Sequence, residues 1–156
     1  MGPMKLLEIL DRDGVIPALT GRDKRSVLAE LAQVASGRSG GAIGADALLD
    51  RLLAREGDRS TGIGQGIAVP HGKATLSKMV AVFGRSLEGI EFGAPDNAPV
   101  HLFFALAVPE KQPGCHLAAL ARIARLLKND AFRHRLLAAA DADSLYAAIR
   151  EEDGRT

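Results

Sequence analysis

Two short and almost uninterrupted apolar runs in the middle of the chain limit its possible folds more than any other feature. They are MVAVF at residues 79–83 and HLFFALAV at residues 101–108, in a region bounded by glycine, proline, aspartate and asparagine. Short apolar runs with such ends are typical of β-strands, and strands without polar alternation are buried on both faces. We therefore expect a central sheet that is covered on both sides. Shorter runs at 14–19 and 66–69 add two expected extended segments.

Helical patterns flank this block of strands. Residues 26–37 place apolar side chains at helical spacing before a glycine-rich stop, and residues 45–56 do the same with four leucines. Three further helices are expected at 115–129, 131–140 and 144–152, with Asp143 or Ser144 capping the last. Helices before and after a block of buried strands predict a three-layer α/β domain.

Length and composition exclude several classes of protein. The 156 residues predict one domain spanning 1–156, with residues 1–3 treated as a cloning remnant. A net charge of +1 argues against nucleic-acid binding, and no apolar run approaches the ~18 residues of a membrane span. The single cysteine, Cys115, permits no internal disulfide and favours a cytoplasmic location. The four histidines lack metal-ligand spacing, so we expect neither metal nor cofactor, and we assign His101 and His134 to structure or solvent.

Residues 55–73, REGDRSTGIGQGIAVPHGK, contain more glycine than a helix or strand needs. A Walker loop that ends at Gly72 and Lys73 would require glycine at Ile67 and serine or threonine at Ala74. The dinucleotide-binding fingerprint also requires glycine at Ile67. Neither phosphate-binding motif therefore fits the stretch.

The same stretch can present a nucleophile. Pro70 fixes its own backbone and the glycines allow tight turns, so we expect His71 at the end of a strand, facing solvent. With an ordinary pKa of about 6.5, most imidazoles carry a free lone pair at pH 7. The alternative is that His71 only caps a turn of a glycine-rich loop.

Arg55 is a candidate phosphate ligand. It lies seven residues beyond Leu48 and three beyond Leu52, so on an ideal helix it continues their apolar stripe toward the fold. A guanidinium held near His71 could bind two phosphoryl oxygens. The alternative is an arginine that extends past Leu52 into solvent.

His116 is a second candidate, close to the start of an expected helix. It shares a helix face with Leu120, Ile123 and Leu127 and is therefore expected to face inward or into a cleft. The positive end of a helix attracts anions and lowers the pKa of a histidine, so a neutral His116 could donate an N–H to phosphate. The alternative is a packing histidine.

STGIGQGIAVPHGK closely resembles the active-site signature of the IIA components of the bacterial phosphotransferase system, in the fructose, mannitol and nitrogen-regulatory branch. The resemblance extends through Arg55–Glu56, PVHLFFALAVPE and HLAALARIARLL, and thus over nearly the whole chain. It implies a mixed α/β sandwich and a phosphorylated histidine at His71, with Arg55 and His116 as active-site partners. Arg59 and Gln65 depart from the family, which commonly has a small residue near the first position and often asparagine at the second.

The resemblance implies a phosphotransferase component that takes a phosphoryl group from HPr or its nitrogen-branch counterpart. We expect a nitrogen-regulatory IIA protein that acts on a regulatory target. Three alternatives remain open: a sugar-transport IIA of the fructose or mannitol type that passes phosphate to a IIB domain, an interaction module without phosphoryl transfer, and an α/β domain whose glycine loop binds an anion.

Overall fold

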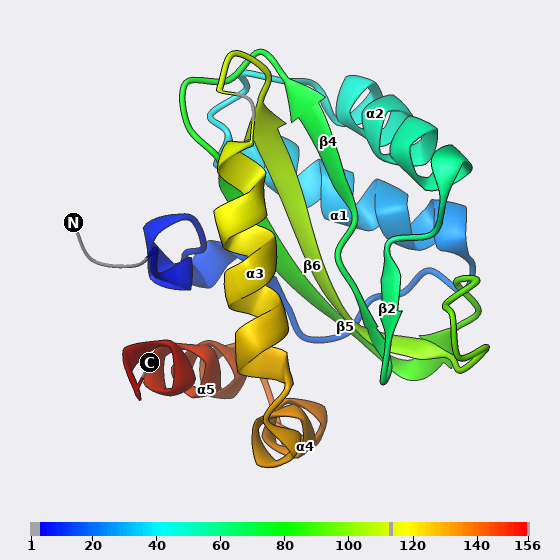
Figure 1. The fold of residues 1–156 in the computed structure, drawn as a ribbon, viewed down its shortest axis with the longest axis vertical. Coiled ribbons are helices and arrows are strands. Elements are labelled where there is room, and N and C mark those ends of the chain that lie inside the picture. Colours follow the sequence, from blue (N-terminus) through cyan, green and yellow to red (C-terminus); the bar gives the residue numbers. More distant parts are fainter. Residues whose placement is uncertain (1–3, 113, 156) are drawn as a thin grey trace.

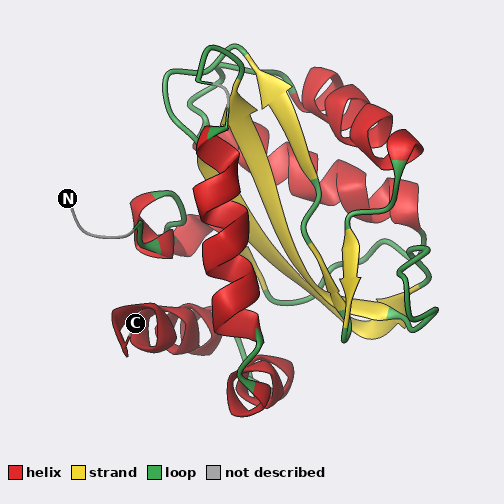
Figure 2. Cartoon of the chain, in the orientation of Figure 1, coloured by secondary structure: helices red, strands yellow, loops and turns green. Residues whose placement is uncertain are grey.

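The computed structural model describes residues 4–112 and 114–155 and contains one mixed sheet between two layers of helices (Figure 1 and Figure 2). The helices are α1 (Lys24–Arg38), α2 (Ala45–Asp58), α3 (Cys115–Leu127), α4 (Asp130–Ala138) and α5 (Ala142–Arg155), and two 3-10 turns occupy Leu6–Glu8 and Arg12–Gly14. The strands are β1 (Val15–Ile16), β2 (Gly62–Gly64), β3 (Ile67–Ala68), β4 (His71–Ala74), β5 (Val80–Ile90) and β6 (Val100–Pro109). The predicted three-layer α/β fold is confirmed.

Strand β6 lies at the centre of the sheet. It pairs antiparallel with β5 on one side and parallel with both β3 and β4 on the other. The sheet is completed by β1, parallel to β5, and by β2, antiparallel to β3. Short strands β2 and β4 lie in the glycine-rich stretch, where the sequence did not predict them.

The apolar run in β6 is buried on both faces, as its sequence predicts. Phe104 and Leu106 belong to one core cluster, with side chains of α3, α4 and α5. Phe103 and Ala105 belong to the other, with side chains of α1 and α2. Because successive side chains of a strand point to opposite faces, β6 contributes alternately to both cores.

Helix α5 begins at Ala142, two residues earlier than the sequence indicated. The Ser144 N–H donates to Asp141 Oδ1 at 2.8 Å, and the Leu145 N–H donates to the Asp141 carbonyl at 3.0 Å. Asp141 therefore caps the helix, and the prediction of Asp143 or Ser144 as its cap is wrong. Both of those residues lie inside the first turn, where no side-chain cap is needed.

The hairpin between β2 and β3 turns at Gln65 and Gly66, which have φ angles of 57° and 78°. Two central residues with positive φ fit the type I′ turn, which prefers asparagine followed by glycine. Here the Gln65 N–H is fixed by Asp96 Oδ2 at 3.0 Å.

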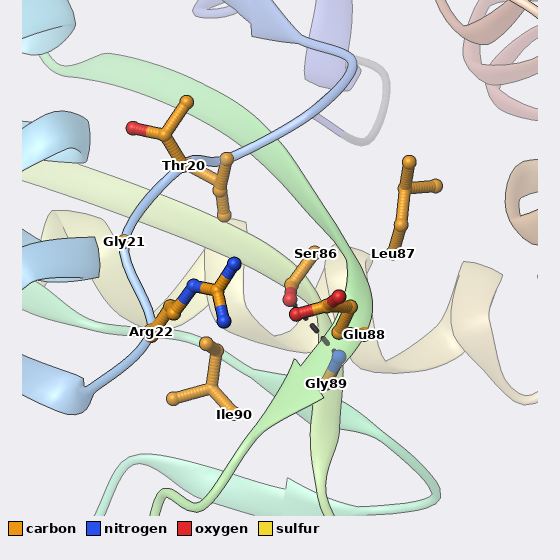
Figure 3. A pocket seen from close by; sticks show the side chains of 9 residues that line it. Thr20, Gly21, Arg22, Ser86, Leu87, Glu88, Gly89 and Ile90 are labelled. Atoms are coloured by element: carbon orange, nitrogen blue, oxygen red, sulfur yellow. Dashed lines mark hydrogen bonds between the residues drawn. The ribbon is translucent and has the colours of Figure 1, made fainter.

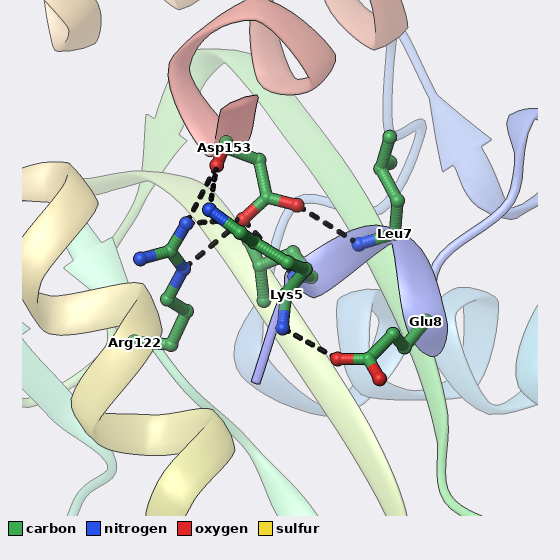
Figure 4. A network of polar contacts seen from close by, with 6 residues as sticks. Lys5, Leu7, Glu8, Arg122 and Asp153 are labelled. Atoms are coloured by element: carbon green, nitrogen blue, oxygen red, sulfur yellow. Dashed lines mark hydrogen bonds and ion pairs between the residues drawn. The ribbon is translucent and has the colours of Figure 1, made fainter. Parts of the chain in front are cut away.

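A buried ion pair joins both ends of the described chain to α3 (Figure 4). Arg122 of α3 donates through Nε and Nη2 to Asp153 Oδ1 of α5 at 3.0 and 2.9 Å. Asp153 also accepts from the backbone N–H groups of Leu6 and Leu7. The position of α3 is therefore coupled to the N-terminal turn and to α5.

We predict that Asp153→Ala strongly destabilises the protein, because it leaves the guanidinium of Arg122 buried without its counter-charge. Removing one partner of a buried pair typically costs about 3–5 kcal/mol. Denaturant unfolding measures the loss. The matched control is Glu151→Ala, which removes the exposed partner of Arg135 and should cost far less. Equal losses in the two variants would contradict a structural role for the buried pair.

Candidate functional site

His71 is the first residue of β4, directly after a break in the strand that runs parallel to β6. Pro70 has no N–H to continue the ladder, but its carbonyl accepts from the Leu106 N–H at 2.9 Å. His71 then pairs in register with Leu106, and its side chain is half-buried. The expectation of a solvent-facing histidine at the end of a strand is corrected: His71 begins a strand, and its half-buried ring lies against the ring of His116.

The ring of His71 is held by the backbone two residues earlier. Its Nδ1 lies 2.9 Å from the carbonyl oxygen of Val69. Since a carbonyl can only accept, Nδ1 carries the hydrogen in the neutral ring. The lone pair of Nε2 is then free, and Nε2 is the nucleophilic atom.

His116 is the second residue of α3, as predicted, and its ring stacks on that of His71. The ring centroids are 5.4 Å apart and the planes are inclined by 29°. The helix begins after Gly114, whose φ of 82° turns the chain into α3. Nδ1 of His116 is buried and has no hydrogen-bond partner among the described residues. A hydrogen on Nδ1 would have no acceptor among the described residues, which favours a neutral His116 with its hydrogen on Nε2.

Arg55 lies on α2 near both rings, but it does not continue the fully buried stripe. That stripe runs Leu48, Leu52 and Glu56, whereas Arg55 is half-buried and its Nη1 donates to the Arg59 carbonyl at 2.7 Å. Glu56 is a buried group that the sequence did not predict. Its spacing of four residues from Leu52 was the available signal.

The electrostatics favour uncharged rings at both histidines. Burial lowers the pKa of His71, and the charge of Arg55 lowers it further, against the Val69 hydrogen bond and the charge of Glu56. Burial also lowers the pKa of His116, with added effects from His71, Lys73 and Arg55. Near neutral pH the site therefore presents two neutral imidazoles beside cationic side chains, which suits an incoming anion.

A close approach between α2 and β4 brings Arg55 to the histidines. A Cβ atom on Gly72 would lie 2.9 Å from Cβ of Arg51 and 3.2 Å from its backbone carbon. His71 and Gly72 point to opposite faces of β4, toward α3 and α2 respectively. The sequence His71–Gly72 therefore allows α3 to pack on one face of β4 and α2 on the other. Helix α3 carries His116, and helix α2 carries Arg55.

The remaining histidines lie elsewhere. His101 on β6 is hydrogen-bonded through Nδ1 to the Ser86 carbonyl at 2.9 Å, and His134 is exposed on α4. A cavity of about 580 Å³ lies beside the 19–22 loop and β5 and is shown in Figure 3. Its lining contains none of His71, His116 and Arg55.

In residues 4–112 and 114–155, no cluster of three or more histidine, cysteine, aspartate or glutamate side chains could hold a metal ion. No helix of the same residues is long and apolar enough to cross a membrane.

The fold is that of the IIA components of phosphotransferase systems, and comparison with known proteins gives the family. The model described as phosphoenolpyruvate-dependent sugar phosphotransferase system, EIIA 2, matches residues 8–152, and the chain belongs to this family. The nitrogen regulatory protein of Bradyrhizobium diazoefficiens is 37% identical over 147 residues, which cover 94% of this chain and 95% of that protein.

Other relatives carry different names. The PTS system fructose-specific EIIABC component of Bacillus subtilis is 34% identical over 96% of this chain, which spans only 24% of that protein. The crystal structure of nitrogen regulatory protein IIA-Ntr from Neisseria meningitidis superimposes with a TM-score of 0.85 at 30% identity, over 92% of this chain and 98% of that one. IIA mannitol from Escherichia coli has the same fold, with a TM-score of 0.76 at 20% identity, over 89% and 97% of the two chains.

The lowered pKa values predict that His71 and His116 both titrate below about 6.5, the ordinary value of histidine. The unfolded chain then takes up protons first as the pH falls. The stability contributed by these two groups is complete above about pH 6.5 and is lost as the pH falls through their folded-state pKa values. NMR titration of the folded protein, compared with the protein in denaturant, measures both shifts. Higher pKa values in the folded state would contradict the burial argument.

We predict opposite effects of alanine at two glycines. Gly72→Ala forces β4 and α2 apart and should cost about 1–3 kcal/mol of stability. Gly57→Ala is the matched control: it meets no atom within 4 Å and lies in helix α2, so it should stabilise by up to about 1 kcal/mol. Thermal unfolding of both variants checks the signs. A neutral Gly72→Ala would show that the close approach does not constrain α2.

Proposed function

We propose that this protein is a phosphocarrier that accepts a phosphoryl group on Nε2 of His71 and passes it to a partner protein. The observation that carries the proposal is the contact between Nδ1 of His71 and the Val69 carbonyl, which leaves Nε2 with the lone pair. Stacking on His116 and the nearby charge of Arg55 support a site for an anion at this atom. Family membership supports phosphoryl transfer as the chemistry.

The transfer is a displacement between two nitrogen atoms. The Nε2 lone pair forms a bond to phosphorus while the N–P bond of the donor's phosphohistidine breaks, and the electron pair of that bond returns to the donor's ring. The ring of His71 gains formal positive charge and keeps its hydrogen on Nδ1. The Val69 carbonyl stabilises this charge, because its hydrogen bond strengthens as the N–H becomes more acidic.

His116 and Arg55 act on the group in transfer. A neutral His116 with its hydrogen on Nε2 can donate to a phosphoryl oxygen, whereas its buried Nδ1 disfavours a charged ring. Arg55 already donates from Nη1 to the Arg59 carbonyl, which limits the motion of its side chain. Its remaining donors can bind oxygens on which charge accumulates in a loose transition state.

We infer that the donor is HPr or an HPr-like carrier of a nitrogen branch, and that the acceptor is a regulatory target. Matches to relatives named nitrogen regulatory protein over more than nine-tenths of both chains support this assignment. The second candidate is transfer to a IIB domain, which the fructose-specific relatives favour. Incubation of the phosphorylated protein with a IIB domain separates the two, since only a sugar-transport IIA loses its phosphate there.

His71→Ala should abolish phosphate acceptance from phosphoenolpyruvate, enzyme I and the carrier, because it removes the nucleophile. Intact-mass measurement detects the adduct, which should be acid-labile and alkali-stable as a phosphoramidate. His101→Ala and His134→Ala are the controls, and both should accept phosphate. Phosphorylation of the His71→Ala variant would show that another residue is the acceptor. An acid-stable phosphate would instead implicate Ser60 or Thr61. Reversible binding without any mass gain would support an anion-binding domain or an interaction module.

His116→Ala should slow transfer without weakening carrier binding, because the N–H of His116 donates to the phosphoryl group during transfer. Loss of one such donor costs about 3 kcal/mol in other enzymes, and His116→Gln should recover part of the rate through its amide N–H. Stopped-flow transfer and separate titration of carrier affinity test both halves. Wild-type rates in both variants would make His116 a packing residue.

Arg55→Lys should also slow transfer while preserving the fold, since a point charge replaces a planar fork that can bind two oxygens. The same stopped-flow assay measures the rate. Unchanged kinetics would remove Arg55 from the site.

A further inference from the structure

Glu56 is a buried carboxylate that takes no part in the proposed reaction. It lies at the C-terminal end of α2, next to Arg55, and is 8% exposed. Its oxygens accept from the Thr61 N–H at 3.1 and 3.2 Å and also from the Thr61 hydroxyl. A buried carboxylate is costly unless it is paired, so these contacts fix both partners closely.

Lys24 holds the carboxylate from the other side. Its Nζ lies 2.9 Å from Glu56 Oε1 and 4.3 Å from the centroid of the Phe92 ring. Lys24 is the first residue of α1, so the contact joins the start of one helix to the end of the next. The Glu56 carboxylate is therefore fixed relative to α1, and its position does not depend on the loop after α2.

From Thr61 the contacts continue to His71. The Thr61 carbonyl accepts from the Val69 N–H at 3.0 Å, and the Val69 carbonyl accepts from Nδ1 of His71 at 2.9 Å. Four residues are thus joined in sequence by hydrogen bonds: Glu56, Thr61, Val69 and His71. The distance between the Val69 carbonyl oxygen and Nδ1 of His71 decides whether the ring carries its hydrogen on Nδ1 or on Nε2.

We propose that Glu56 is a positioning residue, which fixes the Val69 carbonyl through Thr61 and thereby keeps the hydrogen of His71 on Nδ1 and the lone pair on Nε2. Glu56 does not touch the reacting atoms. Its charge also raises the pKa of His71, in agreement with their proximity. The inference rests on the proposed function for its biological meaning, but the tautomer of His71 can be measured without any phosphoryl transfer.

The test is the ring tautomer of His71 in the unphosphorylated protein, measured by nitrogen-15 NMR in wild type, Glu56→Ala and Glu56→Gln. Glu56→Ala removes every acceptor for Thr61, and the ratio of Nδ1–H to Nε2–H should fall about 2- to 10-fold, as expected for the loss of one hydrogen bond. Glu56→Gln keeps one acceptor oxygen and should restore part of the ratio, while loss of the charge lowers the pKa of His71 further.

Glu30→Ala is the matched control. Glu30 is a carboxylate on α1 that likewise accepts from two backbone N–H groups, those of Thr20 and Gly21, but none of these contacts leads to Val69. This variant should leave the tautomer ratio at the wild-type value even where it destabilises the protein. A general loss of stability is thereby separated from positioning.

A folded Glu56→Ala with the wild-type tautomer ratio would overturn the proposal. If Glu56→Ala does not fold, Glu56→Gln decides: an unchanged tautomer ratio in that variant would overturn the proposal. If the ratio shifts as expected but wild-type protein accepts no phosphate, the proposed function fails and the positioning stands. If wild type accepts phosphate while the ratio is insensitive to Glu56, the positioning alone fails.

Discussion

Pairing of two successive short strands with one side of β6 is the constraint on which the site depends. Both β3 and β4 run parallel to β6, and Val69 and Pro70 lie between them. Because strand pairing is interrupted at these two residues, the Val69 carbonyl is free to accept a hydrogen bond from the ring of His71. The Pro70 carbonyl still accepts from the Leu106 N–H. The orientation of the histidine therefore follows from strand pairing, and no mobile loop is required.

Much of the fold was accessible from the sequence because its signals are local. Unbroken apolar runs predicted β5 and β6, and helical periodicity predicted the five α-helices of the described residues. Strands β2 and β4 escaped prediction because their residues are mostly glycine and polar, and their pairing with distant strands makes them extended. The cap of α5 was misplaced by two or three residues, since Asp141, Asp143 and Ser144 are all good capping residues.

The three candidate site residues were named from the sequence, and the structure brings them together from α2, β4 and α3. Their environment was not predictable in the same way. Half-burial of His71 and burial of Nδ1 in His116 both depend on how α3 packs, because this packing stacks the two rings. Glu56 was overlooked because a charged residue in an apolar stripe is ambiguous until its partners Lys24 and Thr61 are seen.

The atom that carries phosphate tests the account most directly. Nitrogen-15 and phosphorus-31 NMR of the phosphorylated protein can assign the N–P bond to one ring nitrogen of one histidine. The structure predicts a bond at Nε2 of His71, with the hydrogen on Nδ1 still directed at the Val69 carbonyl. A phosphoryl group on Nδ1 of His71, or on His116, would contradict the tautomer on which the proposed mechanism rests.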